Sequence, residues 1–185
     1  GETAAIKFTL SEPATDFSVG DVTASGGALS DFAGTGAAYT ATFTPTAVST
    51  EDGVFSIAAG AFTDAAGNAS AASGDHVTAI DTAAPTIAIT SGDTSLTLGE
   101  TAAINFALSE TSTDFSVDDV TASGGTLSIF AGTGAAYTAT FTPTPNSTTD
   151  GVVSVAAGAF TDAAGNASTG DESVSMTVDT VAPAP

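Results

Sequence analysis

The chain repeats itself, and this internal repeat constrains the fold more than any other feature of the sequence. A shift of 98 residues aligns residues 1–87 with residues 99–185 without gaps, and about 62 of the 87 aligned pairs are identical. Residues 32–46 match residues 130–144 completely. Such a period is the length of a whole domain rather than of one solenoid turn. We therefore expect two tandem copies of one module.

A short segment, Asp-Thr-X-Ala-Pro, recurs at residues 81–85 and 179–183 and marks the boundary between copies. Its proline stiffens the link and cannot donate to a strand ladder. We expect a first domain at residues 1–81 and a second domain at residues 82–185, which includes the start of the next linker. The first copy has no counterpart of residues 85–98, so its first strand is expected to be missing or to lie outside this chain. We expect the chain to be part of a longer protein.

Several segments of the second copy alternate apolar and polar residues, which is typical of half-buried strands. In residues 102–109 the apolar face holds Ile104, Phe106 and Leu108, and in residues 136–143 it holds Tyr137, Ala139 and Phe141. Further strands are expected at residues 86–90, 115–122 (with a bulge near Asp118 and Asp119), 126–130, 151–157 and 173–178.

Short strands separated by glycine-rich turns are the pattern of a two-sheet sandwich. We predict an all-β fold of tandem immunoglobulin-like β-sandwich domains, with about seven strands each. The likeness is one of architecture, because the Cys…Trp…Cys pattern of antibody domains is absent. Without cysteine, the remaining ways to stabilise so small a core are metal ions and contacts between neighbouring modules.

Charge excludes several classes of partner. The chain has 21 acidic residues and a single cation, Lys7, which gives a net charge of −20. Nucleic-acid binding needs a basic surface, and an anionic membrane would repel this one. No apolar run is long enough to span a membrane as a helix. Most of the carboxylates must therefore be either hydrated or bound to cations.

Strands that run alternately up and down a sandwich would gather the acidic loops at its two ends. Glu110 and Asp114 follow one strand, while Asp162 and Asn166 precede another, and both loops are expected at the end that holds the linker residue Asp81. The opposite end is expected to gather Asp93, Glu100, Asp150 and, beyond the last strand, Asp179.

Carboxylates collected in this way repel one another, and a divalent cation would remove the repulsion. Calcium suits such a site because it takes six to eight oxygen ligands from carboxylates, amides and backbone. The alternative is that the acidic loops are only hydrated, or that they keep a salt-adapted protein soluble. Both interpretations remain open at this point.

The sequence gives little support to an enzyme. His76 has no cysteine partner and aligns with Val174 in the second copy, so a partly exposed strand residue is expected. Asp118 and Asp119 are adjacent, so in a strand they would point to opposite faces and could not act as an acid–base pair. Residues 34–36, Gly-Thr-Gly, are expected to form a turn rather than a phosphate-binding loop.

Several motifs resemble those of the bacterial Ig-like repeats of large RTX-type surface adhesins. They are Gly-Glu-Thr-Ala, Phe-X-Leu-Ser-Glu, Tyr-Thr-Ala-Thr-Phe-Thr-Pro, Phe-Thr-Asp-Ala-Ala-Gly-Asn and Asp-Thr-X-Ala-Pro. The resemblance covers almost the whole chain. It implies a secreted, cell-surface protein of adhesion and biofilm formation, in which repeats form a stalk that projects an adhesive domain from the cell. It also implies Ca²⁺ at the junctions between repeats, where it stiffens the stalk.

The resemblance also implies a set of calcium ligands in each copy. The matching residues are Glu12, Asp16, Asp64 and Asn68 in the first copy, Glu110, Asp114, Asp162 and Asn166 in the second, and the linker acids Asp81 and Asp179. The first copy departs from the pattern because it lacks its first strand and has Pro13 where the second copy has Thr111.

These observations are compatible with two functions. The expected one is a non-enzymatic, monomeric extender whose partners are the neighbouring repeats of the same chain, with no small-molecule substrate. The alternative is an adhesive module that contacts a partner through its tip loops. Two nearly identical copies with small, alanine-rich loops favour the extender.

Overall fold

The computed structural model describes residues 2–185. The chain divides into two compact units, Gly1–Ala83 and Ala84–Pro185. Apart from one 3-10 turn in each unit, every regular element among the described residues is a strand. The prediction of an all-β fold is therefore confirmed.

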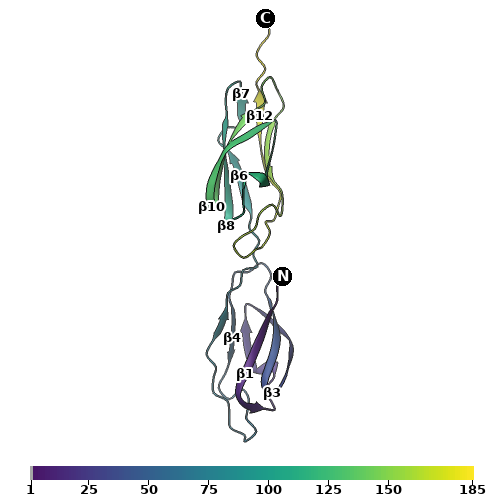
Figure 1. The fold of residues 1–185 in the computed structure, drawn as a ribbon, viewed down its shortest axis with the longest axis vertical. Coiled ribbons are helices and arrows are strands. Elements are labelled where there is room, and N and C mark those ends of the chain that lie inside the picture. Colours follow the sequence, from purple (N-terminus) through teal and green to yellow (C-terminus); the bar gives the residue numbers. More distant parts are fainter. Residues whose placement is uncertain (1) are drawn as a thin grey trace. The chain divides into compact units, whose positions relative to one another are not determined.

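The second unit is a sandwich of two sheets (Figure 1). One sheet has the order β10-β8-β6 and the other has the order β7-β12-β11-β9. Neighbouring strands pair antiparallel, except that β12 and β7 are parallel. This is the predicted immunoglobulin-like architecture. The strands are β6 (Ile87–Ser91), β7 (Ser95–Thr97), β8 (Ala102–Ser112), β9 (Val120–Ser123), β10 (Gly125–Pro143), β11 (Gly151–Val155) and β12 (Glu172–Asp179).

The alternating pattern of the second copy correctly predicts its core. Ile104, Phe106 and Leu108 of β8 are buried, while Asn105 between them is exposed. In β10, Tyr137, Ala139 and Phe141 are buried as expected. These side chains meet those of the other sheet, which include Val153, Val155 and Met176. The hydrophobic effect of this two-sided burial holds the sheets together.

The first unit has the same arrangement with fewer strands. β1 and β3 form one sheet, and β2, β4 and β5 form the other. The described residues of this unit contain no counterparts of β6 and β7, so each sheet is one strand smaller. β5 has three residues, whereas its counterpart β12 has eight and lies between two partners. The strands are β1 (Ala4–Ala14), β2 (Val22–Ser25), β3 (Gly27–Pro45), β4 (Gly53–Ile57) and β5 (His76–Thr78).

The predicted strand at residues 115–122 is wrong in its first half. Val117–Asp119 forms a 3-10 turn, and the strand β9 begins only at Val120. Ser116 caps this turn, since its backbone N–H donates to the Asp119 carboxylate at 2.7 Å and its hydroxyl accepts from the N–H of Asp118. This capping box accounts for the break in alternation that the sequence suggested was a bulge.

Two further differences concern short elements. The strand β7, with Leu96 only 1% exposed, was not predicted, because three residues are too few to show a period. Residues 125–143 form one continuous strand segment that folds back on itself, with Gly132 against the backbone of Ala136 and Tyr137. The predicted turn at residues 132–134 is this reversal.

Candidate metal centre

The loops that carry the predicted ligands of the second unit are joined by a carboxylate. Asp114, which follows β8, accepts hydrogen bonds from the backbone N–H of Thr161 at 3.0 Å and from its hydroxyl at 2.7 Å. The hydroxyl of Ser112 donates to the same carboxylate at 2.7 Å. The loop after β8 and the loop before β12 therefore lie at the same end of the sandwich.

Asp162 organises the second of these loops. One of its carboxylate oxygens accepts from the backbone N–H groups of Ala164 and Asn166 at 2.8 and 2.9 Å. The other accepts from the side-chain amide of Asn166 at 2.8 Å. Gly165 takes a φ of 89°, which lets the loop curl around the carboxylate. Asp162 is thereby fixed in position, and it is buried, with only 5% of its surface exposed.

A second carboxylate lies close to this fixed one. A carboxylate oxygen of Glu110, which is half-buried at the end of β8, lies within 4.8 Å of an oxygen of Asp162. Both residues belong to the second unit: Glu110 lies in β8 just before the loop of Asp114, and Asp162 lies in the loop that Asp114 bonds through Thr161. Two oxygen ligands of one calcium ion lie at most about 5 Å apart, twice the usual Ca–O distance. The separation of Glu110 and Asp162 therefore fits a shared ion.

Hydrogen bonds favour the ionised form of Asp114 and of Asp162. The Ser112 hydroxyl and both donors of Thr161 lower the pKa of Asp114 below its usual value. Burial raises the pKa of Asp162, but the side chain and backbone of Asn166, with the backbone of Ala164, outweigh it, so the net pKa is lowered. Metal binding requires deprotonated carboxylates, so this state is the one that a cation would meet.

The first unit repeats the same loop geometry. Asp16 accepts from the backbone and hydroxyl of Thr63, and Asp64 accepts from Ala66 and from the backbone and side chain of Asn68. The pKa of Asp16 is lowered, chiefly by the backbone of Thr63, and that of Asp64 is lowered, chiefly by the Asn68 side chain. Glu12, Asp64 and Asn68 border one hollow of about 440 Å³.

The linker residue Asp81 is half-buried, and its carboxylate accepts from the backbone N–H of Ala83 at 3.1 Å. The next residue, Thr82, is held in the first unit by hydrogen bonds with Thr46 and Ser49. Pro85 is held in the second unit, where its carbonyl accepts from the N–H of Thr169 at 3.0 Å. Only Ala83 and Ala84 separate these two anchored residues, so the linker is short.

The acids predicted for the opposite end of the second unit lie at that end, where Asp179 pairs with Thr97 and the loop before Asp150 is bonded to Thr180. Glu100 accepts from the backbone and hydroxyl of Thr97, chiefly the backbone, which lowers its pKa. Asp179 accepts from the N–H of Val181, and Asp150 is exposed. Among residues 2–185 these three do not form a cluster of carboxylates close enough to share an ion.

Residues considered for catalysis lie elsewhere. His76 is exposed in β5, where it pairs with Phe55 of β4, and its ring lies 6.3 Å from that of Phe55. Asp118 and Asp119 lie in the 3-10 turn, where the Asp119 carboxylate accepts from the backbone N–H of the cap residue Ser116. Gly34 and Gly36 lie inside β3 with φ of 147° and 67°, at its reversal of direction.

The sequence did not reveal the partners that build this end of the unit. Ser112 and Thr161 hold Asp114, while the hydroxyl of Ser109 accepts from the N–H of Thr86 at 2.9 Å. Serine and threonine are frequent everywhere in this chain, so no local signal marks these residues. Ser109 and Thr161 recur in the first copy as Ser11 and Thr63, and Thr63 makes the matching contact with Asp16, whereas Ser112 is replaced by Ala14.

A model of the bacterial Ig-like domain family matches residues 1–80 and again residues 81–178. No curated protein matches the chain. In the described part of the chain, no helix is long and apolar enough to cross a membrane.

Proposed function

The chain belongs to the family of bacterial Ig-like domains, and from this premise we propose that it is a calcium-stiffened extender of a large surface adhesin of the RTX type. Domains of this family serve as structural units of surface proteins, which agrees with a non-enzymatic role. The proposal adds that the repeats hold a distal adhesive domain away from the bacterial cell. It further adds that Ca²⁺ limits movement between consecutive repeats.

The path of the chain through the second unit is the observation that carries the extender role. The chain begins this unit at Pro85, which is bonded to Thr169 just before β12. It leaves at Thr180, which follows β12 and is bonded to Thr144 and Ser147. The eight residues of β12 separate these two points, a length of about 25 Å. A domain that starts and ends at opposite ends adds length with every repeat.

The calcium part of the proposal rests on Glu110 and Asp162. Two ionised carboxylates no more than 4.8 Å apart repel each other by at least about 3.5 kcal/mol at an effective dielectric constant near 20. The hydrogen bonds from Asn166 and Ala164 to Asp162 offset part of this repulsion, and a bound dication would replace it with attraction. Hard oxygen donors, high negative charge and the absence of thiol or a histidine at this position select calcium over transition metals.

The linker acid lies only a short stretch of chain before the second unit. Asp81 precedes Pro85 by four residues, so the two Cα atoms lie within about 14 Å of each other. We assign Asp81 as a further ligand, by which calcium would connect the linker to the second unit. In the same way Asp179 would serve the repeat that follows.

Thermal unfolding in EDTA and in about 10 mM calcium tests this proposal, since extracellular calcium modules bind with dissociation constants of about 0.1–1 mM. Binding of that strength would add about 1.4–2.7 kcal/mol to the stability of the second unit. The variant Glu110→Gln should lose most of this gain. Asp118→Asn is the matched control. It removes the same charge, but the first copy has Gly20 at this position, so the carboxylate is not part of the repeated acidic pattern. A calcium response that is the same in all three proteins, or absent from the wild type, contradicts the proposal.

A further inference from the structure

The threonine of the repeated segment Asp-Thr-X-Ala-Pro is firmly bonded to the unit that it follows. The hydroxyl of Thr82 donates to the carbonyl of Thr46 at 2.8 Å and accepts from the N–H of Ser49 at 3.0 Å. The backbone N–H of Thr82 donates to the carbonyl of Ser49 at 2.9 Å. These three hydrogen bonds attach a half-buried linker residue to the loop between β3 and β4.

The second unit contains the same arrangement, which we call the threonine anchor. The hydroxyl of Thr180 donates to the carbonyl of Thr144 at 2.7 Å and accepts from the N–H of Ser147 at 2.9 Å. The backbone N–H of Thr180 donates to the carbonyl of Ser147 at 2.9 Å, and the residue is buried, with 2% of its surface exposed. The same partners in both copies show that the anchor is a property of the repeat.

The loop that the anchor holds has the same unusual backbone in both units. Val48 takes a φ of 54°, and the aligned Asn146 takes a φ of 53°. Asparagine tolerates this left-handed conformation, but it is strained for the β-branched valine. Val48 is 80% exposed, so burial of its side chain does not offset the strain. The anchor does, because it bonds Thr46 and Ser49 on either side of Val48.

The anchor also fixes the acid that precedes the threonine. In both units this aspartate accepts from the N–H two residues later, Asp81 from Ala83 and Asp179 from Val181, each at 3.1 Å. Thr82 is the central residue of the short turn that Asp81 closes in this way. The carboxylate of Asp81 is therefore held against a residue that is itself attached to the first unit, and its orientation depends on the anchor.

We infer that Thr82 is a positioning residue, whose hydrogen bonds to the loop between β3 and β4 hold the Asp81 carboxylate in the orientation that binds calcium. This inference rests on the proposed function, in which Asp81 is a ligand. A site whose ligand is correctly oriented only part of the time binds more weakly, in proportion to that fraction of time. The hydroxyl of Thr82 thus raises the calcium affinity without contacting the ion.

A calcium titration of the 185-residue chain, followed by the NMR shifts of the amides of residues 162–166, tests this inference. Thr82→Val keeps the shape of the side chain but leaves the Thr46 carbonyl and the Ser49 N–H without their hydroxyl partner. We expect the calcium affinity of this variant to fall about three- to tenfold. Thr82→Ser retains the hydroxyl and should bind calcium within about twofold of the wild type.

Thr180→Val is the matched control, because it breaks the same hydrogen bonds beside Asp179 instead of Asp81. Thr180 is the more buried of the two threonines, so this variant should lower stability in urea at least as much as Thr82→Val. It should leave the calcium affinity reported by residues 162–166 unchanged. Equal losses of affinity in the two variants would show that the threonines act only through the stability of the fold, and would overturn the inference.

The wild type separates a failure of this inference from a failure of the proposed function. Calcium-dependent shifts in the wild type together with an unchanged affinity of Thr82→Val would overturn the role of Thr82 alone. Absence of calcium-dependent shifts in the wild type would overturn the proposed function and this inference with it.

Hydrogen exchange of the wild type gives a test that does not depend on the folding of any variant. The amides of Ser49 and Thr82 both donate within the anchor. We expect them to be protected in EDTA as well as in calcium, because the anchor forms before the ion binds. Rapid exchange in EDTA, with protection only in calcium, would show that the ion orders the anchor, and this result would overturn the inference.

Discussion

The carboxylate of Asp114 holds Thr161 from across the second unit: it accepts from that residue's backbone N–H at 3.0 Å and its hydroxyl at 2.7 Å, although 47 positions separate them. Asp16 and Thr63 make the same contact in the first unit at 3.1 and 2.9 Å. One side chain thus ties the two acidic loops of each unit together and gives the end of each sandwich its shape.

Removal of the charge on Asp114 should therefore destabilise the second unit. Asp114→Asn keeps the shape of the side chain but weakens charge-assisted hydrogen bonds, at an expected cost of about 1 kcal/mol for a clamp this exposed. Urea unfolding measures the change. Asp118→Asn should cost almost nothing by comparison, and equal costs for the two variants would show that the clamp contributes no stability.

The contribution of Asp114 should depend on pH in a defined direction. Its hydrogen bonds hold the folded-state pKa below the ordinary value of 3.8. The stability it supplies is therefore complete above that ordinary value and is lost as pH falls through the lower, folded-state pKa. The difference in unfolding free energy between the wild type and Asp114→Asn should persist at pH 6 and vanish in strong acid. A difference that grows on acidification would contradict this assignment.

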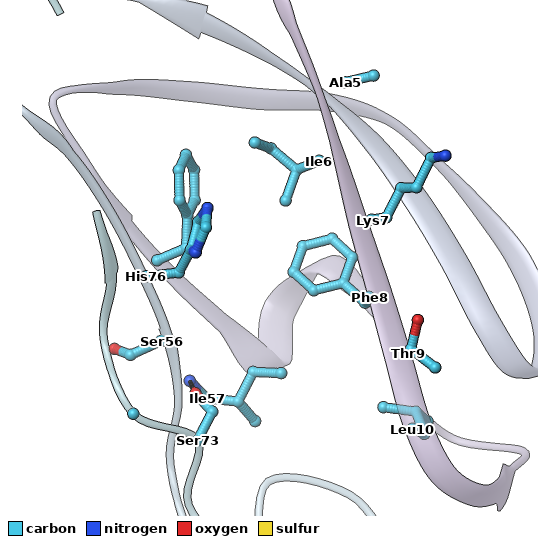
Figure 2. A pocket seen from close by; sticks show the side chains of 12 residues that line it. Ala5, Ile6, Lys7, Phe8, Thr9, Leu10, Ser56, Ile57, Ser73 and His76 are labelled. Carbon is cyan, nitrogen blue, oxygen red and sulfur yellow. Dashed lines mark hydrogen bonds between the residues drawn. The ribbon is translucent and has the colours of Figure 1, made fainter. Parts of the chain in front are cut away.

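The two units should respond differently to the same core truncation. Ile104→Ala removes a side chain that is 0% exposed and should cost about 3 kcal/mol in the second unit. Its counterpart Ile6→Ala removes a half-buried side chain beside an open groove between β1 and β4 (Figure 2) and should cost about 1 kcal/mol. Calorimetry, with each transition assigned by NMR, compares the two. Costs of equal size would mean that the groove is closed in solution.

The reversal within β10 should depend on Gly132. This residue has a φ of 147°, and an added Cβ would lie 2.5 Å from the Cα of Tyr137. Gly132→Ala should cost at least about 2 kcal/mol through this clash and backbone strain. Gly158→Ala is the control, because Gly158 has a φ of 75° with open space around it, and only about 1 kcal/mol is expected there. Denaturant unfolding that ranks the two in the opposite order would contradict this account.

Local periodicity explains why much of the fold was predictable. Tyr137, Ala139 and Phe141 alternate with threonines, and this pattern alone identifies a half-buried strand and its inner face. The strand β7 around Leu96 could not be found in this way because it is held by its parallel pairing with β12, more than 80 residues later in the chain. The turn at Val117–Asp119 depends on a cap at Ser116 that competes with the strand pattern.

The candidate site was predictable in its placement but not in its detail. Strand alternation alone predicts that Glu110 and Asp162 lie at one end of the sandwich, and the structure places them there. The partners of Asp114 were not predictable, since Thr161 is distant in sequence and resembles many other threonines of the chain. Glu100, Asp150 and Asp179 lie at the opposite end, as predicted, since Asp179 pairs with Thr97 and Thr180 bonds Ser147, but they form no close cluster because loops there fold on local contacts such as Glu100 with Thr97.

The central claim, that calcium limits movement between the repeats, is tested most directly by the alignment of the two units in a weakly oriented NMR sample. Residual dipolar couplings measured in EDTA and in about 10 mM calcium, a concentration above the expected dissociation constant, give one alignment tensor for each unit. We predict tensors of different magnitude in EDTA and a single shared tensor in calcium. Different magnitudes that persist in calcium, or a shared tensor in both conditions, would contradict the account.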